Sequence, residues 1–147
     1  MQKPQAAFSL RAAALILKDG KFLAAKHVEH PLYYTVGGVV ELNETAEEAV
    51  VREVWEETGT RLAIERLAFV QERFFQAGGQ KCQEIVFFYL MQGCADLNIP
   101  DGSPTDQKTE TLHWLPLDGL GTIALVPEFL KTASFCSPGI AHIVSRE

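Results

Sequence analysis

Short apolar runs recur along the chain, and runs of this length are typical of β-strands. They predict strands over residues 8–17, 22–28, 32–36, 62–75, 82–92, 111–115 and 141–144. Turn residues at 18–21 predict a hairpin between the first two strands, and residues 76–80 predict a turn between the two long ones. The 62–75 run is expected to be one long strand, either straight or bent, and residues 1–6 to be a loose end.

Residues 45–58 follow a helical pattern instead. Thr45 and Glu48 have the spacing of a capping box, and Gly59 stands where a helix ends in a left-handed residue. At 3.6 residues per turn the larger apolar side chains gather on one side, which is expected to pack against the sheet: Val50, Val51, Val54 and Trp55. A final helix is expected to start at Pro127.

The other side of the 45–58 helix carries Glu53, Glu56 and Glu57, with Arg52 as the only nearby cation. Carboxylates three and four residues apart repel each other by about 0.2–0.5 kcal/mol per pair. A hard divalent cation such as Mg²⁺ prefers carboxylate oxygens and would turn this repulsion into binding. The spacing alone leaves two alternatives open, a metal site and a solvated acidic face.

The order of polar residues around this helix resembles the Nudix box. The matching residues are Gly38, Glu44, Arg52, Glu53, Glu56, Glu57 and Gly59, at the spacing of that motif. Departures from the pattern are Val36, where a proline is common, Asn43, where a glycine is common, and Thr60 at the final hydrophobic position. None of these three supplies a carboxylate, so they bear on loop shape and substrate preference more than on metal binding.

The resemblance implies an α+β Nudix fold, a mixed β-sheet packed between helices in an α/β/α sandwich, with residues 1–147 as one domain. It also implies hydrolysis of a diphosphate bond in a nucleoside diphosphate linked to another group. Mg²⁺ or Mn²⁺ would be the cofactor, held by Glu53, Glu56 and Glu57 with the carbonyl of Gly38 as an addition. A Nudix-fold sensor that binds a nucleotide without cleaving it is the alternative.

The resemblance further assigns catalytic roles. Glu53 is a candidate general base, and Arg52 with Glu44 would be an orienting pair, against the alternative of an ordinary surface salt bridge. The family also uses acids outside the box, and Glu110 is the first candidate here, with Glu84 and Asp106 behind it. Each of these three is an ordinary surface charge in the alternative interpretation.

Substrate contacts are less constrained by the sequence. Arg11 and Lys26 are candidate substrate-binding cations, with solvated strand positions as the alternative. Phe74, or its neighbour Phe75, is the aromatic residue expected to stack on a base, whereas the other phenylalanines are expected in the core. Residues 61–80 contain neither Pro nor Tyr, so downstream markers of ADP-ribose and dinucleoside-polyphosphate enzymes are not evident.

Composition limits the partners. The net charge of −6 argues against a nucleic-acid partner, because phosphate backbones need clustered Lys and Arg. No apolar run reaches a membrane span, and Arg11 interrupts the only N-terminal one, so a cytoplasmic protein with free cysteines is expected. The oligomeric state stays open between a monomer and a homodimer. The long polar segment 93–110 is expected to be mobile or functional.

Overall fold

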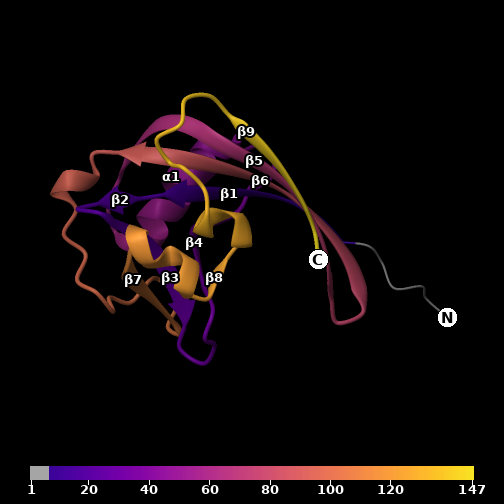
Figure 1. The fold of residues 1–147 in the computed structure, drawn as a ribbon, viewed down its shortest axis with the longest axis horizontal. Coiled ribbons are helices and arrows are strands. Elements are labelled where there is room, and N and C mark those ends of the chain that lie inside the picture. The colour runs from indigo at the N-terminus through magenta and orange to yellow at the C-terminus, as the bar shows by residue number, and fades with distance from the viewer. Residues whose placement is uncertain (1–6) are drawn as a thin grey trace.

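A curved mixed sheet forms the body of the protein in the computed structural model, which describes residues 7–147 (Figure 1). The principal strands are β1 (Ala7–Leu15), β3 (Lys21–His27), β4 (Tyr33–Val39), β5 (Ala63–Ala77), β6 (Gln80–Gln92), β7 (Glu110–Pro116) and β9 (Ala141–Arg146). Two short strands, β2 (Leu17–Lys18) and β8 (Leu125–Val126), complete it. The expectation for residues 1–6 lies outside the described residues.

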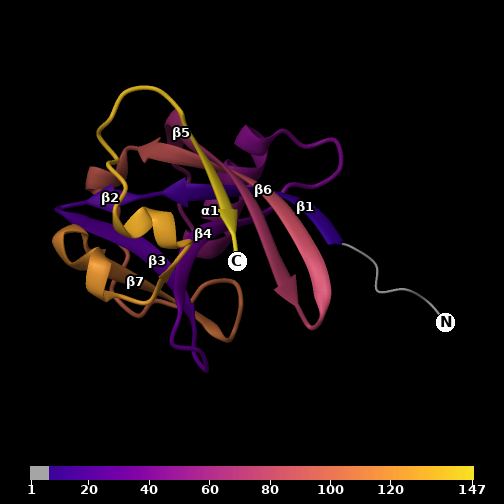
Figure 2. The same ribbon diagram turned by 45° about the vertical axis from the view of Figure 1, so that its right-hand side comes forward.

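The strand order is β2-β3-β4-β1-β6-β5-β9, with β7 paired to β3 and β8 paired to β4. Strand β1 runs parallel to β6 and antiparallel to β4, so it joins the two halves of the sheet. The β5–β6 hairpin is the longest feature and projects from the body, with β9 along its outer edge (Figure 2). Register shifts near Ile64 and Leu67 bend β5, which confirms the bent alternative for this run.

One α-helix, α1 (Ala46–Thr58), is present in the described chain. Its capping box is confirmed, since the amide of Glu48 donates to Thr45 Oγ1 at 3.1 Å, and Gly59 ends it with φ 73°. Val50 and Val54 are fully buried under the sheet, as predicted. Trp55 was expected in the same buried stripe but is 47% exposed, because it lies at the stripe's edge beneath the guanidinium of Arg61.

The opposite face of the sheet is covered by residues 117–135, drawn in orange and yellow in front of it in Figure 1. The expected final helix is wrong: only a 3-10 helix forms there (Glu128–Lys131), after two others, Cys94–Asp96 and Leu117–Thr122. Apolar side chains from this segment fill the core on that face, so packing rather than helical hydrogen bonding fixes it: Leu120, Leu125, Leu130 and Phe135.

Segment 93–110 is anchored to the body of the protein. Leu97 and Ile99 are buried, and the indole N–H of Trp114 donates to the carbonyl of Ile99 at 2.8 Å. Its last residues reach the edge of β4, where the candidate site lies. No helix in residues 7–147 has the length and apolar character needed to span a membrane.

Candidate active site

An acidic cavity of about 260 Å³ lies where α1, strand β4 and the end of segment 93–110 meet. Its lining residues are His27, Gly37, Glu53, Glu56, Glu57, Asp106, Gln107, Thr109 and Glu110. The structure therefore brings together the three glutamates expected to bind metal, Glu53, Glu56 and Glu57, with two of the three outside acids named from the sequence. Segment 93–110 supplies both of those outside acids.

Two glycines of β4 allow close approaches at the site, Gly38 towards the helix and Gly37 towards strand β1. A Cβ atom on Gly38 would lie 2.3 Å from Glu53 Oε1, so any side chain there would displace the carboxylate. A Cβ atom on Gly37 would lie 2.2 Å from the carbonyl oxygen of Ala12, and its φ of 152° disfavours other residues as well. The strand predicted over residues 32–36 continues further than expected, so both glycines lie within β4.

Glu57 is the most buried acid of the site, with 6% of the residue exposed. It accepts a hydrogen bond from the amide of Gly37 at 2.9 Å and shares one with Glu110. Burial, and then the nearby charge of Glu110, raise the pKa of Glu57 to about 9. Glu110 in turn accepts a hydrogen bond from the hydroxyl of Tyr34, and burial raises the pKa of Tyr34.

Arg52 lies among the glutamates and holds several of them. It donates to both carboxylate oxygens of Glu44, at 2.7 and 2.9 Å, and contacts Glu53 at 3.0 Å and Glu56 at 3.2 Å. The guanidinium lowers the pKa of Glu44 to about 2. The pairing of Arg52 and Glu44 is thus a structural fact, while their orienting role stays a prediction.

The donor set suits a hard divalent cation. Within residues 7–147 no three metal-binding side chains are already arranged around one point, since Glu53 and Glu56 face Arg52 and Glu57 faces a backbone amide. The cavity nevertheless concentrates carboxylates around a single arginine, and burial raises the pKa of Glu53 as it does that of Glu57. A divalent cation would relieve this excess of negative charge.

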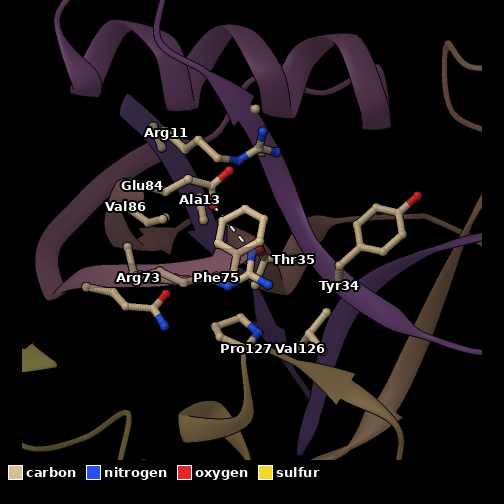
Figure 3. A pocket seen from close by; sticks show the side chains of 15 residues that line it. Arg11, Ala13, Tyr34, Thr35, Arg73, Phe75, Glu84, Val86, Val126 and Pro127 are labelled. Atoms are coloured by element: carbon tan, nitrogen blue, oxygen red, sulfur yellow. Dashed lines mark hydrogen bonds and ion pairs between the residues drawn. The ribbon is translucent and has the colours of Figure 1, made fainter. Parts of the chain in front are cut away.

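A second cavity, here called the sheet cavity, has a volume of about 360 Å³ and shares the lining residue Gly37 with the acidic cavity. It opens on the sheet face opposite α1 (Figure 3). Its lining residues are Arg11, Ala12, Ala13, Tyr34, Thr35, Gly37, Gly38, Gln71, Arg73, Phe75, Glu84, Val86, Phe88, Val126 and Pro127.

Only some of the candidate substrate-binding residues line the sheet cavity. Arg11 lines it, whereas Lys26 lines neither cavity. Phe75 lines it in place of Phe74, whose ring lies on the other side of β5 under the guanidinium of Arg146 at 4.3 Å. Glu84, named as an outside acid, belongs to this cavity and not to the acidic one.

The NUDIX domain model matches residues 8–133, which is most of the chain. The chain belongs to the Nudix family. A MutT-like protein from Streptomyces ambofaciens is 42% identical over 59 residues, a match that covers 40% of this chain and 38% of that relative. The match therefore spans less than half of the relative's length.

Solved Nudix structures share the fold. A MutT protein from Bacillus halodurans superposes with a TM-score of 0.72 at 14% identity, covering 94% of this chain and 89% of that one. An ADP-ribose pyrophosphatase from Streptococcus suis superposes with a TM-score of 0.59 at 17% identity, covering 93% and 98% of the two chains. At these identities the likeness concerns the fold alone.

Sequence reasoning missed several cavity residues. One is His27, which lines the acidic cavity and whose Nδ1 accepts a hydrogen bond from the amide of Glu29 at 3.1 Å. Gln71 gave no signal, because a strand residue reveals its face only when the register is known. Arg73 gave none either, since its partners lie on distant strands.

Proposed function

We propose that the protein hydrolyses a diphosphate bond in a nucleoside diphosphate linked to another group, using a divalent metal ion. The observation that carries this proposal is the cavity that gathers Glu53, Glu56 and Glu57 and shares the lining residue Gly37 with the sheet cavity. A substrate bound at Gly37 would place its charged diphosphate beside the glutamates and its organic end in the sheet cavity.

Glu53, Glu56 and Glu57, with the carbonyl of Gly38, would hold Mg²⁺ or Mn²⁺. When bound, the ion neutralises the diphosphate oxygens and lowers the pKa of a bound water. Arg52 restrains Glu53 and Glu56 through direct contacts and is itself fixed by Glu44, so this pair orients the ligands. Arg52 would thus be a positioning residue, and Glu44 would be the anchor that fixes it.

The proton of the attacking water needs an acceptor in the acidic cavity. Glu53 and Glu110 are the two candidates for this general base. Burial raises the pKa of Glu53, which makes its carboxylate a better acceptor near neutral pH. Glu110 is held by Tyr34 and by Glu57, so its carboxylate is fixed in place at the cavity wall.

The test is phosphate release from a panel of substrates with Mg²⁺, with Mn²⁺ and with EDTA. The panel contains ADP-ribose, nucleotide sugars, dinucleoside polyphosphates, and normal and oxidised nucleoside triphosphates, with a coupled phosphatase where the product requires it. We expect metal-dependent cleavage of one class. No cleavage of any compound, together with metal-dependent nucleotide binding, would indicate a sensor instead.

The remaining expectations are part of the same proposal. They are a cytoplasmic location and a small-molecule substrate; the net charge of −6 supports the absence of a polynucleotide partner. Light scattering at several concentrations would distinguish the monomer from the homodimer.

A further inference from the structure

The sheet cavity is hollow because small side chains meet there on neighbouring strands. Ala13 of β1 lies opposite Gly37 of β4, and Val86 of β6 lies beside Arg11. Larger side chains surround these small ones, and Figure 3 shows Glu84, Arg11 and Phe75 pointing into the cavity. A volume of about 360 Å³ falls in the range of small-molecule sites.

Glu84 is the one acid in this lining. Its side chain is 16% exposed, and its recorded partner is Arg73, whose Nη1 lies 3.4 Å from Oε2. No hydrogen bond to Oε1 is recorded within the described chain. In residues 7–147 every buried side-chain oxygen and nitrogen has a hydrogen-bond partner, so an oxygen without one is not buried. Oε1 is therefore accessible, and Figure 3 shows the Glu84 side chain pointing into the cavity, where it can accept a hydrogen bond.

Arg73 is held by other contacts and does not neutralise Glu84 fully. It makes a two-point ion pair with Glu147, at 2.6 and 3.1 Å, and its guanidinium lies 3.9 Å from the ring centroid of Phe75. These contacts fix the Phe75 ring as a stacking surface. Arg11 has no recorded ion pair or hydrogen bond in residues 7–147, which leaves its guanidinium free to donate to a ligand.

The cavity therefore offers a ring to stack on, a carboxylate acceptor and a guanidinium donor. Guanine matches this set, since one edge carries two adjacent N–H donors, N1–H and the N2 amino group, next to the O6 acceptor. Adenine and cytosine carry a single amino group there, and uracil a single N–H between two carbonyls. A carboxylate left without donors would cost binding free energy.

We infer that the sheet cavity binds the base of a guanine nucleotide, with Glu84 accepting from N1–H and the N2 amino group and Arg11 donating to O6. Phe75, backed by Arg73, stacks on the base. This inference rests on the proposed function for the placement of the diphosphate at Gly37. It goes further by naming the base and the residue that selects it.

The first experiment compares guanine with hypoxanthine, which lacks only the N2 amino group. Calorimetric binding of GMP, IMP, XMP and AMP without metal measures base recognition independently of catalysis. GMP is expected to bind about tenfold or more tightly than IMP, as befits one hydrogen bond to a charged group, and AMP weakest of all. Equal affinities for GMP and IMP would overturn the inference, and this comparison needs no variant.

The second experiment uses Glu84→Gln. A glutamine can accept from N1–H and donate to the C2 carbonyl of xanthine, so the GMP preference over XMP should fall by about tenfold or more, or reverse. Glu65→Gln, an exposed glutamate on the same long hairpin, is the matched control and should keep the wild-type order. An unchanged order in a folded Glu84→Gln protein, checked by thermal melting, would also overturn the inference.

The same four bases are then compared as kcat/KM on the derivative that the substrate panel identifies. Guanine-selective binding without cleavage would reject the proposed hydrolysis and keep the base assignment. Metal-dependent cleavage with no preference for guanine would support the proposed hydrolysis and reject the base assignment.

Discussion

The acidic cavity and the sheet cavity share the lining residue Gly37 but are built in opposite ways. The core of the acidic cavity comes from one contiguous stretch, residues 37–57, completed by segment 93–110. The sheet cavity draws residues from each of β1, β4, β5, β6 and β8, and its lining runs from Arg11 to Pro127 in the sequence. One cavity is thus encoded locally and the other by strand register.

The two cavities also differ in the balance of their charged side chains. In the acidic cavity burial and mutual repulsion raise the pKa of Glu57 to about 9 and raise that of Glu53 as well. In the sheet cavity Arg73 is matched by Glu147 and Glu84, and Arg73 lowers the pKa of Glu147. An excess of negative charge suits a charged ligand at some cost in stability, whereas a cavity with charges of both signs, from Arg11, Arg73 and Glu84, selects by shape and hydrogen bonding.

The largest expected effect follows from this difference. Glu57→Gln should lower kcat by at least about 100-fold, because it removes a carboxylate from the proposed metal site. The metal-free variant should melt at the same temperature as the wild type or higher, because the raised pKa of Glu57 makes burying this carboxyl costly at neutral pH and the amide removes that cost. Steady-state kinetics and thermal melting check both parts.

Glu47→Gln is the matched control, because Glu47 lies on the same helix, is exposed and lines neither cavity. It should leave kcat unchanged. Wild-type turnover in the Glu57 variant would show that the acidic cavity does not hold the catalytic metal.

The second prediction concerns the single helix that carries the acidic cavity. Val54→Asp places an unpaired charge at a fully buried position of α1 and should lower the free energy of unfolding by about 3 kcal/mol or more. Denaturant titration measures it. Leu42→Asp, at a position 94% exposed, should change stability little; equal losses in the two variants would mean that α1 does not dock through Val54.

The sequence predicted the acidic cavity better than the sheet cavity, because neighbouring residues form much of the acidic cavity and strand register forms the sheet cavity. The helix, its caps and the grouping of Glu53, Glu56 and Glu57 depend on neighbouring residues, so spacing alone predicted them. The choice between Phe74 and Phe75 depends on which face of β5 points to the cavity. That face is set by pairing with β6 and by the bend in β5, neither of which one sequence reveals.

The missing final helix has a related cause. Residues 117–135 carry enough apolar side chains to cover one sheet face, but Gly119, Gly121 and Pro127 interrupt the run and leave only a short stretch for a helix before Pro138. Long-range packing then decides the path of the backbone.

The third prediction tests which of two neighbouring phenylalanines of β5 contacts the substrate in the sheet cavity. Phe75→Ala should raise KM about tenfold with a smaller change in kcat, because a stacking surface for the organic end of the substrate is lost. Phe74→Ala is the matched control, since its ring lies outside the cavity, and it should leave KM unchanged. Kinetics on the substrate identified by the panel distinguishes the two; a larger effect at Phe74 would reverse the assignment.

The smallest expected effect concerns Glu44, whose pairing with Arg52 is the compensated part of the acidic cavity. The folded-state pKa of Glu44 is lowered to about 2, below its ordinary value, so the carboxylate stabilises the folded state above the ordinary value. That stabilisation is lost as the pH falls towards 2. Glu44→Gln should therefore lower the free energy of unfolding at pH 7 by about 1 kcal/mol, and this difference should shrink in acid.

Denaturant titration of both proteins across the acid range, at one ionic strength, measures that difference. Glu41→Gln is the matched control, because its carboxylate is 68% exposed and lies 3.9 Å from Arg52, too far for a strong contact. A Glu44 variant whose deficit persists unchanged at low pH would show that the glutamine disturbs the loop instead of the ion pair. A deficit that disappears in acid, accompanied by a lower kcat at neutral pH, would support Glu44 as the anchor that holds Arg52 among the glutamates.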